Sequence, residues 1–277
     1  MNESSPSSIR FSSFQLIAML LGGLVLLFVI GPLAGMFLDT SPAELARTAG
    51  EMEVRRSIWL TLLTAMGATL IFALAAIPFS YFLARHDFPL KRLVMGIIDV
   101  PVVIPHSAAG IAILGVIARE SLIGRAGQSI SDSLGFDGRF SFVNTPVAIM
   151  LAMAFVSLPF LVNAARDGFA AVPERLEKAA MNLGASRTRA FFTISLPLAW
   201  RSIVSGLVMM WARGMSEFGA VIIVAYHPTI TPVLIYERFG EFGLKYARPV
   251  AALFILVCLA VFIALRFLAP GDQRAES

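Results

Sequence analysis

The chain carries little charge for its length. Only 14% of the 277 residues are charged, whereas 57% are hydrophobic. So few charges cannot cover the surface of a soluble globular protein of this size. Cysteine is nearly absent as well, because Cys258 is the single one, and this excludes an internal disulfide. The shortage of charge indicates a membrane protein.

Motifs typical of several function classes are also missing. The sequence contains no G-x-x-x-x-G-K-[ST] loop, so the chain cannot hydrolyse ATP itself, and it has no H-E-x-x-H or G-x-S-x-G motif. No series of ionisable residues resembles a proton relay, which disfavours an ion-driven carrier. Basic residues are not interleaved with aromatic ones as a nucleic-acid site requires. The sequence therefore predicts no catalytic residue, no metal site, no cofactor bound by the chain and no nucleic-acid partner.

Long apolar runs dominate what is present. Six stretches reach or approach the roughly 20 residues that a helix needs to cross the hydrocarbon core. The alternating pattern of a membrane barrel is absent, and the first run is longer than the core of a signal peptide. We therefore expect an all-α, polytopic transmembrane helical bundle that forms a single domain over residues 1–277. The expected spans cover residues 14–38, 57–84, 93–118, 140–165, 198–225 and 249–268, with a long polar loop at 166–201.

Basic residues indicate the orientation of these spans. With a cytoplasmic N-terminus, the inner segments carry twelve Lys and Arg residues and the outer segments carry nine, and the inner excess is strongest around 166–201. We expect both termini to be cytoplasmic. Of the outer segments, 119–139 is rich in glycine and predicts a structured lip. Segment 226–248 is too short to span and predicts an interfacial or re-entrant helix.

The inner polar loop combines signals for two short helices. Pro173 suits a first helical turn, and Ala179 and Ala180 are strong helix formers with small side chains. Gly184 is a natural helix terminator, and Ser186 can cap a second helix. An ordinary amphipathic helix at the membrane interface fits these signals as well, so helix physics alone leaves the role of the loop open.

The spacing in this loop resembles the EAA loop of ABC importer permeases. An Ala-Ala pair is followed four residues later by glycine and, after nine more residues, by Ile-x-Leu-Pro, so six of seven signature positions match. The departure is Lys178, where the family usually has glutamate. The resemblance implies that the loop fits a groove in a cytoplasmic ATPase. The residues then expected to couple the two proteins are Glu177, Lys178, Ala179, Ala180, Gly184, Ala185, Ser186, Arg187, Ile194, Leu196 and Pro197.

The resemblance covers nearly the whole chain and implies the type I ABC importer permease fold. It further implies an assembly of two permease subunits, expected to be a homodimer, with two cytoplasmic ABC ATPases and an extracytoplasmic binding protein. The assembly would lie in the lipid bilayer of the inner membrane of a prokaryote. ATP and Mg would be used by the ATPase, whose closure would draw two loops together and rock the spans from inward-open to outward-open.

The fifth span contains a candidate ion pair. Arg213 and Glu217 are four residues apart and would share one helix face, with Ser216 beside them. A charge at bilayer depth costs at least ~2.5–3.5 kcal/mol, so such residues normally face the bundle or a wet path. They can form a structural ion pair or line a translocation pathway or gate, and the sequence leaves both readings open.

The third span is interrupted by prolines. Pro101 and Pro105 stand four residues apart and break the helical hydrogen-bond ladder, and His106 and Ser107 follow directly. His106 can hydrogen-bond a backbone carbonyl within the bundle, or it can line the pathway together with Pro105 and Ser107.

Three segments narrow the expected solute. Residues 213–220 resemble the fifth span of the molybdate, tungstate and sulfate permeases, and residues 99–107 resemble the same group. Residues 227–228 and 234–239 are similar to the molybdate/tungstate branch. The resemblance implies import of molybdate or tungstate from an oxyanion-binding protein. The alternative is the same architecture importing sulfate or another small solute.

Overall fold

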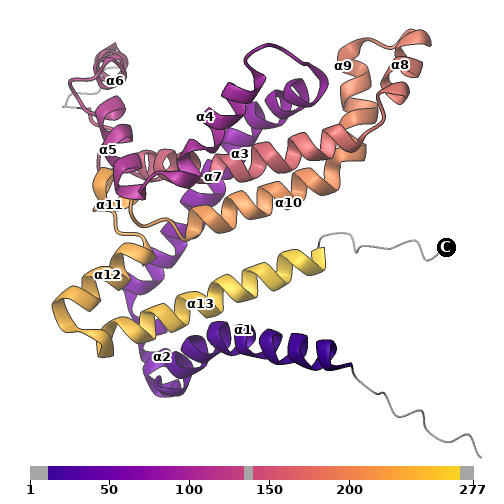
Figure 1. The fold of residues 1–277 in the computed structure, drawn as a ribbon. Helices are drawn as coiled ribbons and strands as arrows, with labels where there is room; N and C mark the ends of the chain where they lie inside the picture. The colour runs from indigo at the N-terminus through magenta and orange to yellow at the C-terminus, as the bar shows by residue number, and fades with distance from the viewer. Residues whose placement is uncertain (1–11, 134–139, 269–277) are drawn as a thin grey trace, which may run out of the picture.

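The computed structural model describes residues 12–133 and 140–268, and every regular element in these ranges is a helix (Figure 1). The expected all-α fold class is confirmed. The elements are α1 (Ser13–Leu38), α2 (Pro42–Gly50), α3 (Met52–Arg85), α4 (Lys91–Val103), α5 (His106–Ile117), α6 (Leu122–Ser133), α7 (Pro146–Ala171), α8 (Glu174–Asn182), α9 (Arg187–Ala190), the π-helix η1 (Phe191–Ser195), α10 (Leu196–Met215), α11 (Val221–Val224), α12 (Thr231–Phe242) and α13 (Leu244–Leu268).

Five helices of the described ranges are long and apolar enough to cross a membrane by length and composition. They are α1, α3, α7, α13 and the continuous stretch Arg187–Met215. A sixth crossing requires α4 and α5 together, and these two helices meet at 113°. The third span, expected over 93–118, is thus broken as its prolines predict, and the break is a sharp bend. The break falls at Ile104, which is extended because a residue before proline is disfavoured in the α conformation.

Several helices also begin or end away from the predicted boundaries. Helix α3 has 34 residues and is about 51 Å long, well beyond the roughly 30 Å of the hydrocarbon core. An apolar run in the sequence indicates only the part of a helix that lies within lipid. The charged first turns of α3 were therefore not predicted. Likewise α7 includes Arg166 and α10 includes Arg201, so the polar loop shortens to residues 172–195, which we call the elbow. Helix α10 ends at Met215, ten residues before the predicted end of the fifth span.

Helices α3, α7 and α10 form the core of the bundle. Their facing surfaces are rich in alanine and other small residues, which lets helices approach closely where lipid replaces water. Two glycines mark the closest contacts between α7 and α10. A Cβ added at Gly168 would lie 2.5 Å from the Cβ of Ser202, and one at Gly206 would lie 2.9 Å from that of Ala164. These positions accept only glycine without displacing a neighbour.

The remaining long helices pack at one side of this core. Helix α12 lies against α13 and the first turns of α3, where Val54, Leu234 and Val250 are buried together. A buried hydroxyl network joins α12 to α3, in which the backbone N–H of Thr231 donates to Thr61 Oγ1 at 2.9 Å. Helix α1 contacts α13 only weakly and has no buried residue, so its apolar side chains remain available for lipid or another chain.

The ends of the helices define two sides of the molecule. Figure 1 shows the start of α1, the end of α13 and the helices α8 and α9 on one side, and α2, α6 and α12 on the other. Helices α6 and α12 occupy the two outer segments predicted as a lip and a short helix. Part of the predicted lip, residues 134–139, lies outside the described residues, as do the basic residues Arg10 and Arg274 of the two tails.

Candidate functional site

The elbow consists of two short helices around a glycine turn, as the sequence predicts. Helix α8 ends in a Schellman arrangement, because the N–H of Ala185 donates to the carbonyl of Ala180 and that of Gly184 donates to Met181. Gly184 has φ of +90°, a conformation that favours glycine. The Ser186 hydroxyl caps α9 by accepting from the N–H of Arg189. Pro173 differs slightly from expectation, since it caps α8 instead of standing in its first turn.

One surface of the elbow is open to a partner. Lys178 is exposed and forms an ion pair with the exposed Glu174 at 2.9 Å. Leu183, directly before the glycine turn, is 89% exposed, an unusual position for leucine that sequence reasoning missed. Among the predicted coupling residues, Ala179, Gly184, Ser186, Arg187 and Pro197 are exposed, whereas Ala180, Ala185, Ile194 and Leu196 are half-buried.

Glu177, which the sequence groups with the residues expected to contact the ATPase, does not belong to this open surface. Its carboxylate is buried and accepts hydrogen bonds from Arg85 Nη2 at 2.6 Å and Nε at 2.8 Å, from Ser195 Oγ at 2.7 Å and from Tyr81 Oη at 2.8 Å. Burial opposes ionisation, but these donors outweigh it and hold the pKa of Glu177 below its ordinary value of 4.5. The carboxylate therefore stays charged at neutral pH and ties α8 to its neighbours.

We call Tyr81, Arg85, Glu177 and Ser195 the anchor. Arg85 and Tyr81 come from the last turns of α3 and Ser195 from the end of η1, so the anchor joins two elements to α8. An aromatic contact reinforces it, because the ring of Phe191 lies 4.9 Å from that of Tyr81. Sequence reasoning missed Tyr81, Arg85 and Ser195, since no local pattern relates residues so far apart in the chain.

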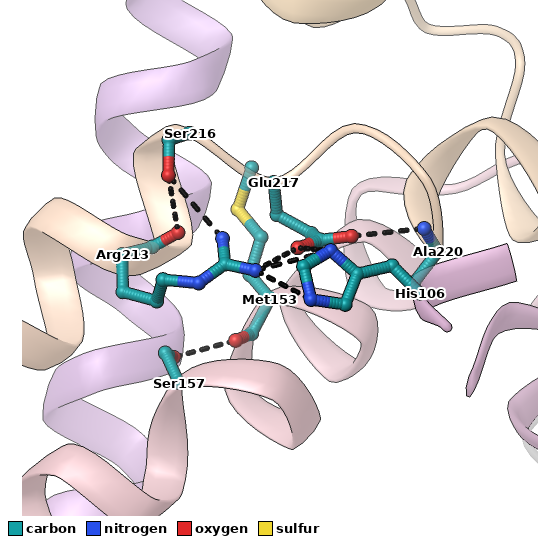
Figure 2. A network of polar contacts seen from close by, with 7 residues as sticks. All are labelled: His106, Met153, Ser157, Arg213, Ser216, Glu217 and Ala220. Atoms are coloured by element: carbon teal, nitrogen blue, oxygen red, sulfur yellow. Dashed lines mark hydrogen bonds and ion pairs between the residues drawn. The ribbon is translucent and has the colours of Figure 1, made fainter. Parts of the chain in front are cut away.

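A second group of polar side chains lies where α10 ends and α5 begins. Figure 2 shows Arg213 reaching toward His106, with Glu217 between them. Arg213 Nη2 lies 3.0 Å from Glu217 Oε2 and 2.9 Å from His106 Nε2, and His106 Nδ1 lies 3.3 Å from Glu217 Oε2. The Ser216 hydroxyl accepts from Arg213 Nη1 at 3.2 Å. We call these four residues the polar cluster.

The polar cluster corrects one sequence prediction and shows the partners of His106. Arg213 and Glu217 form their ion pair, but they do not share a helix face, because α10 ends at Met215 and Glu217 lies in the following turn. There its Oε1 accepts from the N–H of Ala220 at 2.9 Å. His106 pairs with side chains and not with a backbone carbonyl. Its neighbours Pro105 and Ser107 lie at the same break and are exposed.

Replacing Arg213 alone should be more harmful than replacing the pair. Arg213→Ala leaves the Glu217 carboxylate, which is fully buried, without its main partner, and breaking a buried ion pair costs about 3–5 kcal/mol. Arg213→Ala/Glu217→Ala removes both charges and should recover part of that loss. Thermal unfolding of the purified variants measures the difference, and additive losses in the two single variants would contradict the pairing.

Comparison with known sequences shows which protein family this chain matches. The family described as "Binding-protein-dependent transport system inner membrane component" matches residues 76–271. The chain is 44% identical over 250 residues to the "Molybdate/tungstate transport system permease protein WtpB" of Thermococcus kodakarensis, covering 90% of this chain and 93% of the relative. It is 31% identical to the "Probable sulfate transport system permease protein cysT" of Chlorokybus atmophyticus, covering 77% and 73% of the two chains.

A solved structure shares the fold. A bacterial alginate ABC transporter, solved in complex with an alginate pentasaccharide-bound periplasmic protein, matches with a TM-score of 0.70 at 17% identity. The match covers 92% of this chain and 93% of the other. At this identity the match concerns the arrangement of helices and leaves the solute open.

Proposed function

The chain belongs to the binding-protein-dependent inner membrane transport components, and within them to the molybdate/tungstate permeases; on this premise we propose that it imports molybdate or tungstate. It is a multi-pass transmembrane permease subunit of an ABC transporter and not itself an ATPase. The imported solute is a small tetrahedral dianion, and the energy comes from ATP hydrolysed by another protein.

The identity to the molybdate/tungstate relative carries the proposal. That relative is 44% identical over 90% of this chain, whereas the sulfate relative is 31% identical over 77%. The difference favours molybdate or tungstate over sulfate, which stays the second candidate because the three anions share shape and charge. The geometry is compatible with either, since both need a membrane path that tolerates a dianion.

The elbow is the proposed contact with the ATPase. It projects from the end of α7 and the start of α10 (Figure 1). Side chains around its glycine turn are exposed. A small-residue surface at Ala179 and Gly184 lets a partner approach closely, and Lys178 supplies a charge of the sign opposite to that usual in the family. Leu183 adds an apolar contact that a groove could bury.

The rest of the assembly follows from one elbow per chain. Two copies of the permease would meet two cytoplasmic ATPases, which bind ATP and Mg, while this chain binds no cofactor. An extracytoplasmic oxyanion-binding protein would deliver the solute at the side of α2, α6 and α12. This places both termini and the elbow in the cytoplasm, an orientation supported by the basic residues of the inner segments.

Reconstitution tests the proposal directly. The chain is expressed with an ABC ATPase and an oxyanion-binding protein of the same organism, and the complex is placed in proteoliposomes. We expect ATP-dependent accumulation of radiolabelled molybdate, suppressed by excess tungstate and only weakly by excess sulfate. Stronger suppression by sulfate would favour the second candidate. An assembled complex that accumulates none of the three anions would contradict both.

A further inference from the structure

The polar cluster lies within the depth of the bilayer. Helix α4 begins at Lys91, near the inner end of α3, and its 13 residues place the following break about 20 Å along the helix. Helix α10 leads to the same place from the elbow, because Arg213 stands 17 residues after Leu196 and about 26 Å along that helix. The hydrocarbon core is roughly 30 Å thick, so two independent helices put the cluster inside it.

Part of the cluster is open at this depth. The side chains of His106 and Arg213 are 37% and 22% exposed, while Glu217 is completely buried beneath them. A guanidinium facing lipid is strongly disfavoured, so the open edge of Arg213 must face a polar surface or water. The open side of the cluster therefore faces a water-accessible path or another subunit, and not lipid.

The cluster has balanced charges. Arg213 and Glu217 cancel, and a neutral His106 with its proton on Nδ1 can donate to Glu217 Oε2 while Nε2 accepts from Arg213 Nη2. An unbalanced arginine in a dry path would hold a dianion tightly, whereas conduction requires that an ion can leave as well as enter. The Arg213 guanidinium, the Ser216 hydroxyl and the His106 ring still offer hydrogen bonds to a passing oxyanion.

The cluster also lies where two separate elements of the fold meet. Gly219 brings the turn after α10 against α5, since a Cβ there would lie 2.9 Å from the Cβ of His106. Helix α10 is continuous with η1 and the elbow, whereas His106 begins a separate helix. Any shift of α10 relative to α5 would change the distance between Arg213 and His106. It would thereby change which hydrogen-bond donors of the cluster are open to a passing oxyanion.

From these observations we propose that the polar cluster is a transient contact site for the transported oxyanion, and that Glu217 keeps this contact weak. The inference rests on the proposed function, because it takes the solute to be a tetrahedral dianion. Arg213, Ser216 and the open edge of His106 contact the anion. Glu217 does not, and acts by cancelling the charge of Arg213.

Glu217→Gln tests this role with little change of shape. The amide keeps an oxygen that can accept from the Ala220 N–H but leaves Arg213 uncompensated, so the cluster becomes cationic. We expect the purified complex with its ATPase to retain close to one tungstate per permease chain after desalting, measured by mass spectrometry of tungsten. The unmodified complex should retain at least tenfold less. Uptake by Glu217→Gln should slow at least tenfold, because the anion is released slowly.

Three further variants make the result decisive. His106→Arg adds a positive charge at the half-open position while Glu217 itself is kept, so it should also retain tungstate even where Glu217→Gln fails to assemble. Arg213→Gln/Glu217→Gln restores neutrality and should lose retention. Glu237→Gln makes the same chemical change on α12, outside the cluster, and should retain no more tungstate after desalting than the unmodified chain.

The outcomes separate this inference from the proposed function. If neither cationic variant retains tungstate, or if retention persists without Arg213, the transient-contact proposal is overturned. Loss of dimeric assembly without retention would instead identify the cluster as a subunit contact and would overturn it too. Failure of the unmodified complex to transport any oxyanion contradicts the proposed function, whatever the retention measurements give.

Discussion

Replacing Glu177 by alanine is expected to abolish most ATP-driven uptake while the chain still inserts in the membrane. The substitution leaves the Arg85 side chain, which is 8% exposed, as a buried charge without its partner, and such a loss costs about 3–5 kcal/mol. Tyr81 and Ser195 lose their acceptor at the same time. Helix α8 should detach from α3 and η1, so movement of the ATPase would no longer reach α10. Uptake and copurification of the ATPase are the two measurements.

Glu174→Ala is the matched control for this change. Glu174 lies one helical turn earlier on α8 and is exposed, and an exposed ion pair such as the one with Lys178 contributes about 0.2–1 kcal/mol. Uptake by the Glu174→Ala variant should fall by less than a factor of two. Equal losses in Glu174→Ala and Glu177→Ala would show that α8 is sensitive to any lost carboxylate, and the anchor would have no special role.

Gly184→Val is expected to uncouple the ATPase without affecting membrane insertion. A Cβ at this position meets no other atom within 4 Å, so the substitution creates no clash. The backbone is the obstacle, because φ of +90° is strained for a β-branched residue by about 1–3 kcal/mol. The glycine turn between α8 and α9 should open, so α9 would point away from α8. We expect at least a tenfold loss of uptake and weaker copurification of the ATPase.

Two other glycine variants isolate the backbone effect. Asparagine tolerates positive φ better than valine, so Gly184→Asn should retain much of the uptake. Gly22→Val places the same side chain on α1, again with no atom within 4 Å, at a position without positive φ and far from the elbow. It should transport normally. Full uptake by Gly184→Val would mean that the turn conformation is not required for coupling.

Local signals were sufficient to predict most of the elbow. The terminator at Gly184 and the cap at Ser186 act on residues at most five positions away, so the sequence shows them directly. The transmembrane helices were predictable for a similar reason, because hydropathy adds up along one segment. Their exact ends were not, since charged turns such as those of Arg55 and Arg166 continue the helix outside the lipid.

Contacts between distant segments could not be predicted in the same way. Glu177 and Arg85 are 92 residues apart, and a glutamate beside the Ala-Ala pair resembles a surface residue until its partner is known. Arg213 and His106 are 107 residues apart, and their contact depends on the 113° bend that follows Ile104. Proline spacing indicated a break in the third span, but a bend angle depends on packing against α7 and α11.

The π-helix η1 determines how the elbow would respond to the loss of a residue. The N–H of Leu196 donates to the carbonyl of Phe191, five residues back, so this turn contains one residue more than an α-helical turn. From one residue of an α-helix to the next, the direction of the side chain rotates by about 100° around the helix axis. The wide turn absorbs this extra residue, so removing one residue between Phe191 and Ser195 should restore an α-helical turn and leave α9 and α8 in nearly the same direction from the axis of α10. The same deletion in the regular part of α10 would rotate them by about 100°. The surplus residue thus widens the helix beside the anchor without changing the direction of the elbow.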